Sequence, residues 1–108
     1  MKTRIVVSDE AIESALAQLR VNIRQALLKH GNLSFISAHE VVGTIREELH
    51  ECEQACHQNN LVEFSKEVLD VATVCVFAHA SRVQFNRNET EALVELEMSR
   101  TKPIFKNK

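Results

Sequence analysis

Two pairs of carboxylates with the same spacing stand near the middle of the chain. Glu48 and Glu51 form E-x-x-E, and after fifteen intervening residues Glu67 and Asp70 form E-x-x-D. Carboxylates that gather without a basic partner need raised pKa values or a bound cation. Hard oxygen ligands favour magnesium, manganese or calcium over zinc, and magnesium commonly bridges carboxylates to substrate phosphates. The four acids therefore predict a divalent-metal site and phosphate-ester or anhydride chemistry.

The residues around each acid pair have the periodicity of an amphipathic helix. At 100° per residue, an apolar stripe lies beside each pair, with Glu48 at the edge of the first stripe. The stripes consist of Val41, Ile45, Leu49, Cys52 and Cys56, and of Phe64, Val71, Val74, Cys75 and Ala78. Carboxylates beside a core rarely lack a partner. This placement favours a functional cluster over solvated surface acids, which are the ordinary alternative in a chain with 15 acidic residues.

An Asn-Asn turn at 59–60 separates the two predicted helices. Counted from this turn, Glu51 and Glu67 are about equally distant, and so are Glu48 and Asp70. An antiparallel helical hairpin would therefore place Glu51 near Glu67 and Glu48 near Asp70. All four carboxylates are expected to meet at one level of the helix pair.

The segments before the hairpin also predict helical structure. Apolar residues spaced three and four apart from Ile12 to Ala26 predict an amphipathic first helix. Gly31 is expected to end this helix as a C-cap, because glycine adopts positive φ without strain. Ser37 and Glu40 then form a capping box that starts the next helix, which is expected to end near His57.

The segments after the hairpin predict a shorter fourth helix and a tail. Asn88 and Glu91 resemble an N-terminal cap, so this helix is expected to run from Asn88 to about Arg100. Residues 101–108 are expected to be a basic, solvated tail. Ile5–Val7 has no partner strand and is discounted. With only two glycines and one proline, residues 1–108 predict a single all-α domain, a helical hairpin with flanking helices.

Composition narrows the possible partners and the compartment. The formal net charge is −2 and the basic residues are dispersed, so nucleic-acid binding is not expected. The longest apolar run, Val74–Ala78, has five residues, which is too short for a membrane span. The segment MKTRIVVSDE is not expected to act as a signal peptide. Three cysteines, an odd number, favour a reduced, cytoplasmic setting.

The acid spacing is similar to the signature of the MazG-like, all-α nucleoside triphosphate pyrophosphohydrolases, over residues 35–82. The segment SAHEVVGTIREELHE also resembles the metal-binding helix of short bacterial and phage members. The resemblance implies four-helix subunits that dimerise or tetramerise, with magnesium or manganese held by the four acids. It also implies hydrolysis of a (deoxy)nucleoside triphosphate to monophosphate and pyrophosphate, by attack of water at the α-phosphorus.

Further residues of the chain are candidates for the catalytic and substrate-binding roles. Beyond the four metal ligands, Glu48 or the adjacent Glu47 would position the attacking water. Lys66, Arg82 and Asn86 are the candidates for binding the substrate. Many relatives stack the base on Trp or Tyr, and this chain has neither. A non-catalytic binding or regulatory module on the same helical scaffold is therefore the alternative to an enzyme.

Cysteines and histidines raise two further alternatives. Four possible zinc ligands cluster in the second predicted helix: His50, Cys52, Cys56 and His57. The two cysteines share a helix face but the histidines point away from it, which disfavours a tetrahedral zinc site. Cys75 and His79, four residues apart, could form a nucleophile–base pair. A core cysteine beside a surface histidine is the simpler interpretation.

A lone chain also has too little core to cover all of these apolar stripes. The hairpin contributes two stripes and the first helix contributes another. Helical bundles bury such stripes against neighbouring helices, from the same chain or from another copy. We therefore expect a homodimer or a dimer of dimers.

Overall fold

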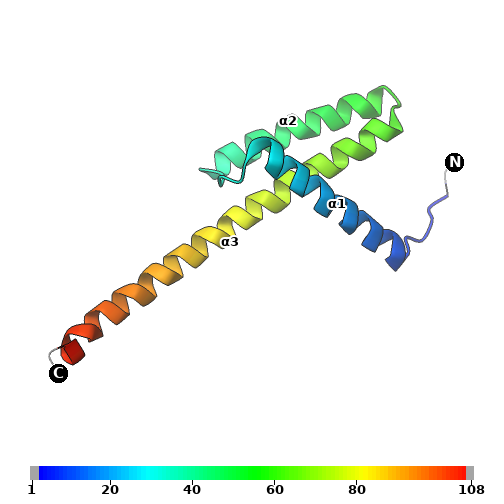
Figure 1. Ribbon diagram of the computed structural model, residues 1–108. Coiled ribbons are helices and arrows are strands. Elements are labelled where there is room, and N and C mark those ends of the chain that lie inside the picture. Colours follow the sequence, from blue (N-terminus) through cyan, green and yellow to red (C-terminus); the bar gives the residue numbers. More distant parts are fainter. Residues whose placement is uncertain (1–2, 107–108) are drawn as a thin grey trace.

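The computed structural model of the protein describes the backbone of residues 3–106 and the side chains of residues 3–100. It has three helices, α1 (Asp9–His30), α2 (Ala38–His57) and α3 (Leu61–Lys106) (Figure 1). No strand occurs among residues 3–106, and Ile5–Val7 is exposed and has no regular secondary structure. The prediction of an all-α chain is confirmed.

Local signals fix the boundary between α1 and α2. Gly31 adopts a φ of 80° and donates its backbone N–H to the carbonyl of Leu27 at 2.8 Å, which ends α1. The Ser37 hydroxyl accepts a hydrogen bond from the backbone N–H of Glu40 at 3.2 Å, which starts α2. Both helix ends lie where the sequence predicted them, because each depends on a single residue type with a local role.

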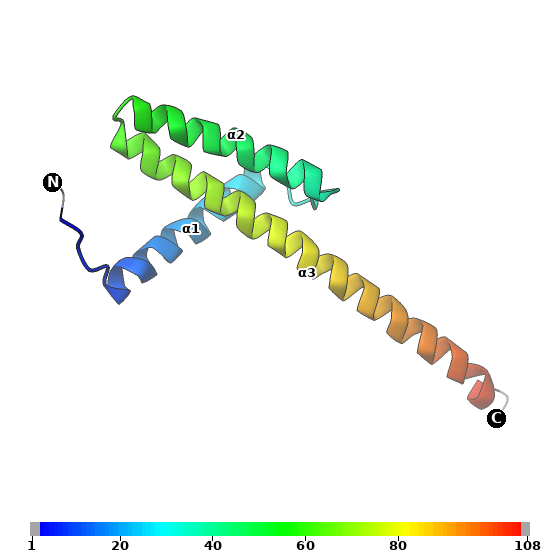
Figure 2. The same ribbon diagram turned by 180° about the vertical axis from the view of Figure 1, so that it is seen from behind.

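The two asparagines after α2 reverse the chain. Asn59 adopts a positive φ of 56°, which asparagine tolerates better than most residues. The Asn60 side chain accepts a hydrogen bond from the backbone N–H of Glu63 at 3.1 Å and so caps the start of α3. As a result, α2 and the first part of α3 lie side by side and run in opposite directions (Figures 1 and 2). Helix α1 crosses this pair and packs against α3.

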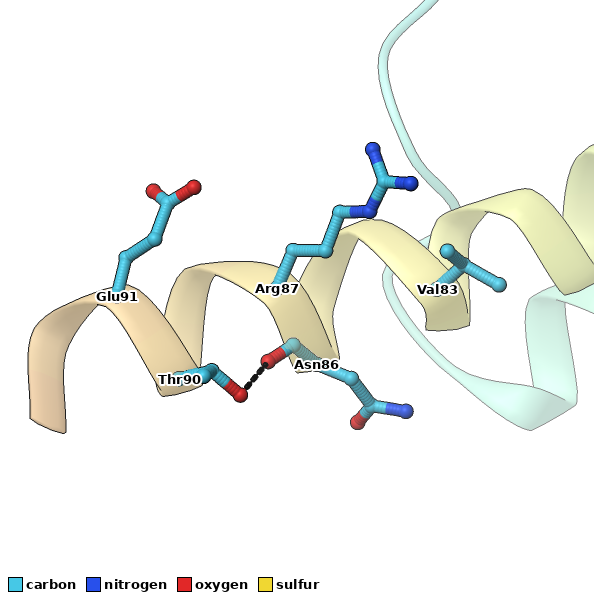
Figure 3. Close-up of a pocket in the computed structure, with 5 residues that line it drawn as sticks. All are labelled: Val83, Asn86, Arg87, Thr90 and Glu91. Atoms are coloured by element: carbon cyan, nitrogen blue, oxygen red, sulfur yellow. Dashed lines mark hydrogen bonds between the residues drawn. The ribbon is translucent and has the colours of Figure 1, made fainter. Parts of the chain in front are cut away.

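The prediction of a separate fourth helix is wrong, because α3 continues through Asn88 and ends at Lys106. The Asn88 side chain accepts a hydrogen bond from the Gln84 side chain at 2.9 Å instead of capping a new helix. One turn away, the Thr90 hydroxyl donates to the backbone carbonyl of Asn86 at 2.9 Å (Figure 3). No glycine or proline interrupts residues 61–102, so nothing in the backbone forces a break.

The buried part of the chain is small. Among residues 3–100 the buried side chains are Cys52, Ala55, Glu67 and Thr73, and the first two are the whole apolar core. Every side chain from Arg82 to Arg100 is exposed, because this half of α3 extends away from α1 and α2 (Figure 1). The molecule is accordingly 79 Å long. Within the described residues, no helix is both long enough and apolar enough to cross a membrane.

The packed face of α2 differs in part from the predicted stripe. Leu49 is 47% exposed and Cys56 is also exposed, although both were expected in the core. Cys75 on α3 is exposed as well. The face of α2 that packs against α3 includes Glu48 and Ala55 in place of Leu49 and Cys56. Relative to the predicted stripe, α2 is therefore rotated so that Glu48 turns toward α3. Glu48 is half-buried on this face and lines the cleft described below.

Candidate functional site

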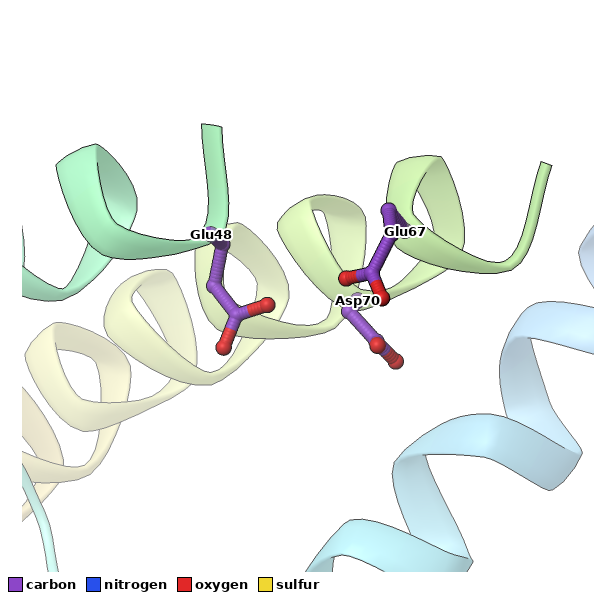
Figure 4. A group of neighbouring side chains, drawn as sticks. All are labelled: Glu48, Glu67 and Asp70. Carbon is purple, nitrogen blue, oxygen red and sulfur yellow. The ribbon is translucent and has the colours of Figure 1, made fainter. Parts of the chain in front are cut away.

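Three carboxylates converge between α2 and α3. Glu48 comes from α2, and Glu67 and Asp70 come from successive turns of α3. One oxygen of each lies within 4.8 Å of the others, and all three side chains point to the side of the helix pair on which α1 lies (Figure 4). Ligand oxygens around an octahedral magnesium are ~3–4 Å apart, given metal–oxygen distances of ~2.1 Å. A closure of about an ångström by rotamer adjustment would bring these oxygens to that spacing.

The cluster carries an electrostatic cost. Glu67 is only 7% exposed, and its pKa is raised from 4.5 to about 7. Burial is the main cause, followed by hydrogen bonding with the carboxyl groups of Glu63 and Glu51 and by the negative charges of Glu51 and Asp70. The pKa of Glu48 is also raised, first by burial and then by the charges of Glu51 and Asp70. A bound cation would relieve this cost, because it favours the ionised form of every acid.

Two carboxylate oxygens in the cluster are buried without a hydrogen-bond partner among the described residues. They are Oε2 of Glu48 and Oε2 of Glu67. Buried oxygens of this kind normally have a donor or a bound ion, because an unsatisfied acceptor costs ~1–3 kcal/mol or more when charged. The donor set consists only of carboxylate oxygens, which suits magnesium, manganese or calcium. The residues present therefore fit a hard divalent cation.

Asp70 differs from the other two acids because both of its oxygens have partners. The Lys66 ammonium lies 3.3 Å from Oδ2, and the side-chain amide of Asn22 donates to Oδ1 at 3.0 Å. The same amide nitrogen donates to the Thr73 hydroxyl at 2.7 Å. Sequence reasoning missed Asn22, which lies on α1, beside the apolar stripe of that helix. The sequence feature that could have identified Asn22 is its polar amide next to Ile23, on a helix face where apolar residues were expected.

The cluster forms one wall of a cleft of about 470 Å³ between α1 and the other two helices. Glu51 also lines this cleft, but it is exposed and lies outside the three-carboxylate group. Lys29 and His30 of α1 and Lys66 of α3 line the same cleft. Carboxylates and two ammonium groups therefore face one space, an arrangement suited to a cation together with a phosphorylated ligand.

A more apolar cavity of about 340 Å³ adjoins this cleft and shares His30, Glu48 and Thr73 with it. Phe35 and Phe77 line the cavity, with ring centroids 5.7 Å apart in an edge-to-face arrangement. Both rings are half-buried. The cavity thus offers aromatic and aliphatic surface directly beside a metal-competent carboxylate, as a nucleotide base and its phosphates would require.

The other predicted site residues lie away from the cluster within one chain. Glu47 is exposed and is not among the residues that line the cleft. Arg82 stands over the Phe85 ring, with its guanidinium 5.4 Å from the ring centroid, and is ~18 Å along α3 from Asp70. Asn86 lies on an open face of α3, farther still from the acids (Figure 3). A single chain brings neither Arg82 nor Asn86 to the carboxylates.

The cysteine alternatives gain no support from the geometry. Cys52 is buried, and burial together with the charges of Glu67 and Glu48 raises the pKa of its thiol, which disfavours the thiolate needed for zinc binding or attack. No hydrogen bond joins Cys75 to His79 within the part of the chain that the structure describes. The carboxylate cluster is therefore the site with the strongest chemical rationale.

Comparison of the chain with known protein families, with curated proteins and with solved structures finds no match. The MazG-like resemblance accordingly rests on the acid motifs and their spacing alone.

Proposed function

We propose that the protein is a divalent-metal-dependent hydrolase of a (deoxy)nucleoside triphosphate, with magnesium or manganese as its metal. The observation that carries this proposal is the convergence of Glu48, Glu67 and Asp70 within 4.8 Å. Two of these acids have a buried oxygen without a partner among the described residues. Burial raises the pKa of Glu48 and of Glu67, and acids perturbed by burial and by neighbouring charge cluster at functional sites.

Each wall of the cleft has a role in this proposal. Glu48, Glu67 and Asp70 hold the metal, which supplies charge neutralisation for the phosphates and a more acidic water. Lys29 and Lys66 bind the outer phosphate oxygens from the two sides of the cleft. Glu51, exposed to solvent beside the cluster, accepts a proton from the attacking water. The cavity that contains the Phe35 and Phe77 rings holds the base.

The reaction follows from the resemblance to the MazG-like enzymes. Attack of water at the α-phosphorus would give the nucleoside monophosphate and pyrophosphate. Attack at the γ-phosphorus would instead release single phosphate. Analysis of the products formed from each common nucleoside triphosphate with Mg²⁺ tests this point, and single phosphate as the product would contradict the proposed reaction.

We also propose that the chain dimerises. The interface would include the antiparallel α2–α3 hairpin and the exposed C-terminal half of α3 (residues 82–100), called the free half of α3 below. The apolar core of one chain consists of Cys52 and Ala55 among residues 3–100, which is too little to stabilise a helical protein. Phe85, Leu93 and Leu96 on the free half of α3 are 52%, 64% and 49% exposed. A second copy of the chain would cover these side chains and supply the missing core.

A non-catalytic binding module is the second candidate, and one observation favours it. Both oxygens of Asp70 have partners from the chain itself, the Lys66 ammonium and the Asn22 amide. Lys66 can therefore neutralise part of the cluster in place of a metal. Calorimetric titration with Mg²⁺ and Mn²⁺, followed by a turnover assay with nucleoside triphosphates, separates the candidates, because the enzyme requires both binding of a divalent cation and turnover. Binding of a nucleotide without turnover, with or without metal, would favour the module.

A further inference from the structure

One polar contact next to the carboxylate cluster joins α1 to α3. Helix α1 has no buried residue, so apolar packing alone fixes its position on α3 weakly. The Asn22 side chain of α1 hydrogen bonds to two α3 residues, Asp70 at 3.0 Å and Thr73 at 2.7 Å. Thr73 is buried, and Asn22 and Asp70 are half-buried. Within residues 3–100, no other side-chain hydrogen bond joins α1 to α3.

The hydrogen bonds leave the Asn22 amide one orientation. The Thr73 hydroxyl donates its proton to the backbone carbonyl of Leu69 at 2.9 Å. That hydroxyl can then only accept from Asn22, so the NH₂ group and not the carbonyl of the amide must face Thr73. The second proton of the same NH₂ group is directed at Oδ1 of Asp70. Thr73 therefore fixes the orientation of the Asn22 amide, and the amide in turn fixes the orientation of the Asp70 carboxylate.

We propose that Asn22 is a positioning residue that orients Asp70 for a divalent cation without touching the cation itself. This inference rests on the proposed metal site. Asn22 donates a hydrogen bond to Oδ1 of Asp70, which leaves Oδ2 of Asp70 for the cation. In this scheme Oδ2 turns toward Glu48 and Glu67 when the Lys66 ammonium moves away. Residues that hold a ligand in this way commonly change metal affinity about 10- to 100-fold when they are removed.

Lys66 and Asn22 have opposite effects in this scheme. The Lys66 ammonium competes with the cation for Asp70, and its side chain is 62% exposed, so it can leave at little cost. Asn22 carries no charge, remains hydrogen bonded and keeps the carboxylate in place after Lys66 has moved. Removal of Lys66 should therefore tighten binding of the metal alone, and removal of Asn22 should weaken it.

The test is calorimetric titration of Mn²⁺ and Mg²⁺, without nucleotide, into the full chain and its variants. Asn22→Ala should weaken the affinity about 10- to 100-fold. Gln25→Ala is the matched control, because it removes an amide from the same cleft and the same helix with no bond to Asp70. It should change the affinity by no more than about twofold, as surface substitutions do.

A second variant distinguishes positioning from general packing. Thr73→Val keeps the shape of the side chain but removes the acceptor that orients the amide. It should weaken the affinity less than Asn22→Ala does, and the double variant should bind no more weakly than Asn22→Ala alone. Independent packing defects would instead add. Melting in EDTA identifies any variant that fails to fold, and Thr73→Val then provides the test if Asn22→Ala does not fold.

Two outcomes overturn different parts of the scheme. If the wild-type chain binds neither cation, the metal site fails and the role of Asn22 fails with it. If the wild-type chain binds and Asn22→Ala binds as tightly as Gln25→Ala, only the role of Asn22 is wrong.

Discussion

The substitution Glu67→Gln tests the cluster most directly, because it removes one charge and keeps the size of the side chain. Glu67 is 7% exposed, and its pKa is raised to about 7, mainly by burial. In the unfolded chain the pKa should return to its ordinary value of 4.5. Since the folded protein holds this proton more tightly, its contribution to stability is complete below about pH 4.5 and is lost as the pH rises through about 7.

The size of the expected stability change follows from the difference between the pKa of Glu67 in the folded chain and in the unfolded chain. A change in pKa from 4.5 to about 7 corresponds to at most ~3 kcal/mol of unfolding free energy. The glutamine side chain is neutral at every pH and therefore keeps the stability that the wild-type chain loses. In EDTA, Glu67→Gln should match the wild type near pH 4.5 and should be more stable near pH 8 by up to ~3 kcal/mol. The same variant should lose stabilisation by Mg²⁺, because the metal loses a charged ligand.

Urea unfolding at several pH values, with and without Mg²⁺, measures both effects. Glu95→Gln is the control, since Glu95 is an exposed acid on the free half of α3, far from the cluster. It should change stability by no more than about 0.5 kcal/mol at any pH and should leave the Mg²⁺ response intact. If Glu67→Gln and Glu95→Gln behave alike in both experiments, the carboxylates neither repel one another nor bind a cation at this position.

Three further predictions concern the metal, Glu51 and the oligomer. Millimolar Mg²⁺ or Mn²⁺, at a hundredfold excess over Kd, should stabilise the fold by ~2.7 kcal/mol and raise Tm by about 10 °C. An equal response to Na⁺ at matched ionic strength would indicate charge screening alone. Glu51→Gln should leave the metal-free chain as stable or more stable and abolish turnover, and unchanged turnover would remove Glu51 from the mechanism. Sedimentation should show a dimer or larger at micromolar concentration and a monomer for Leu96→Glu; a wild-type monomer would contradict the proposed interface.

Local signals in the sequence predicted the helix ends around the site correctly. Gly31 and Ser37 each act through one backbone interaction, so their effect depends little on the rest of the fold. The Asn-Asn turn is equally local and brings Glu48 close to Glu67 and Asp70. Acid spacing combined with one turn thus predicted that Glu48 would approach Asp70, but Glu51, expected as the fourth member, lies outside the three-carboxylate group.

Features that depend on contacts between helices were not predicted. Asn88 resembles a cap in the sequence, but Gln84 on the preceding turn supplies a partner and the helix continues. The rotation of α2 that exposes Leu49 follows from its packing against α3, which periodicity within α2 alone does not define. Asn22 was missed for the same reason, since its bonds reach residues 48 and 51 positions away in the chain.

The burial of Glu67 and the small apolar core have the same consequence for the stability of the chain. A chain with so little apolar burial gains little from the hydrophobic effect, yet it places an acid with a pKa of about 7 in its most buried region. Both features lower the stability of an isolated, metal-free chain. A second copy would add apolar burial along α3, and a cation would neutralise Glu67 and its neighbours. Dimerisation and metal binding are therefore expected to reinforce one another, because each stabilises the folded helices that the other requires.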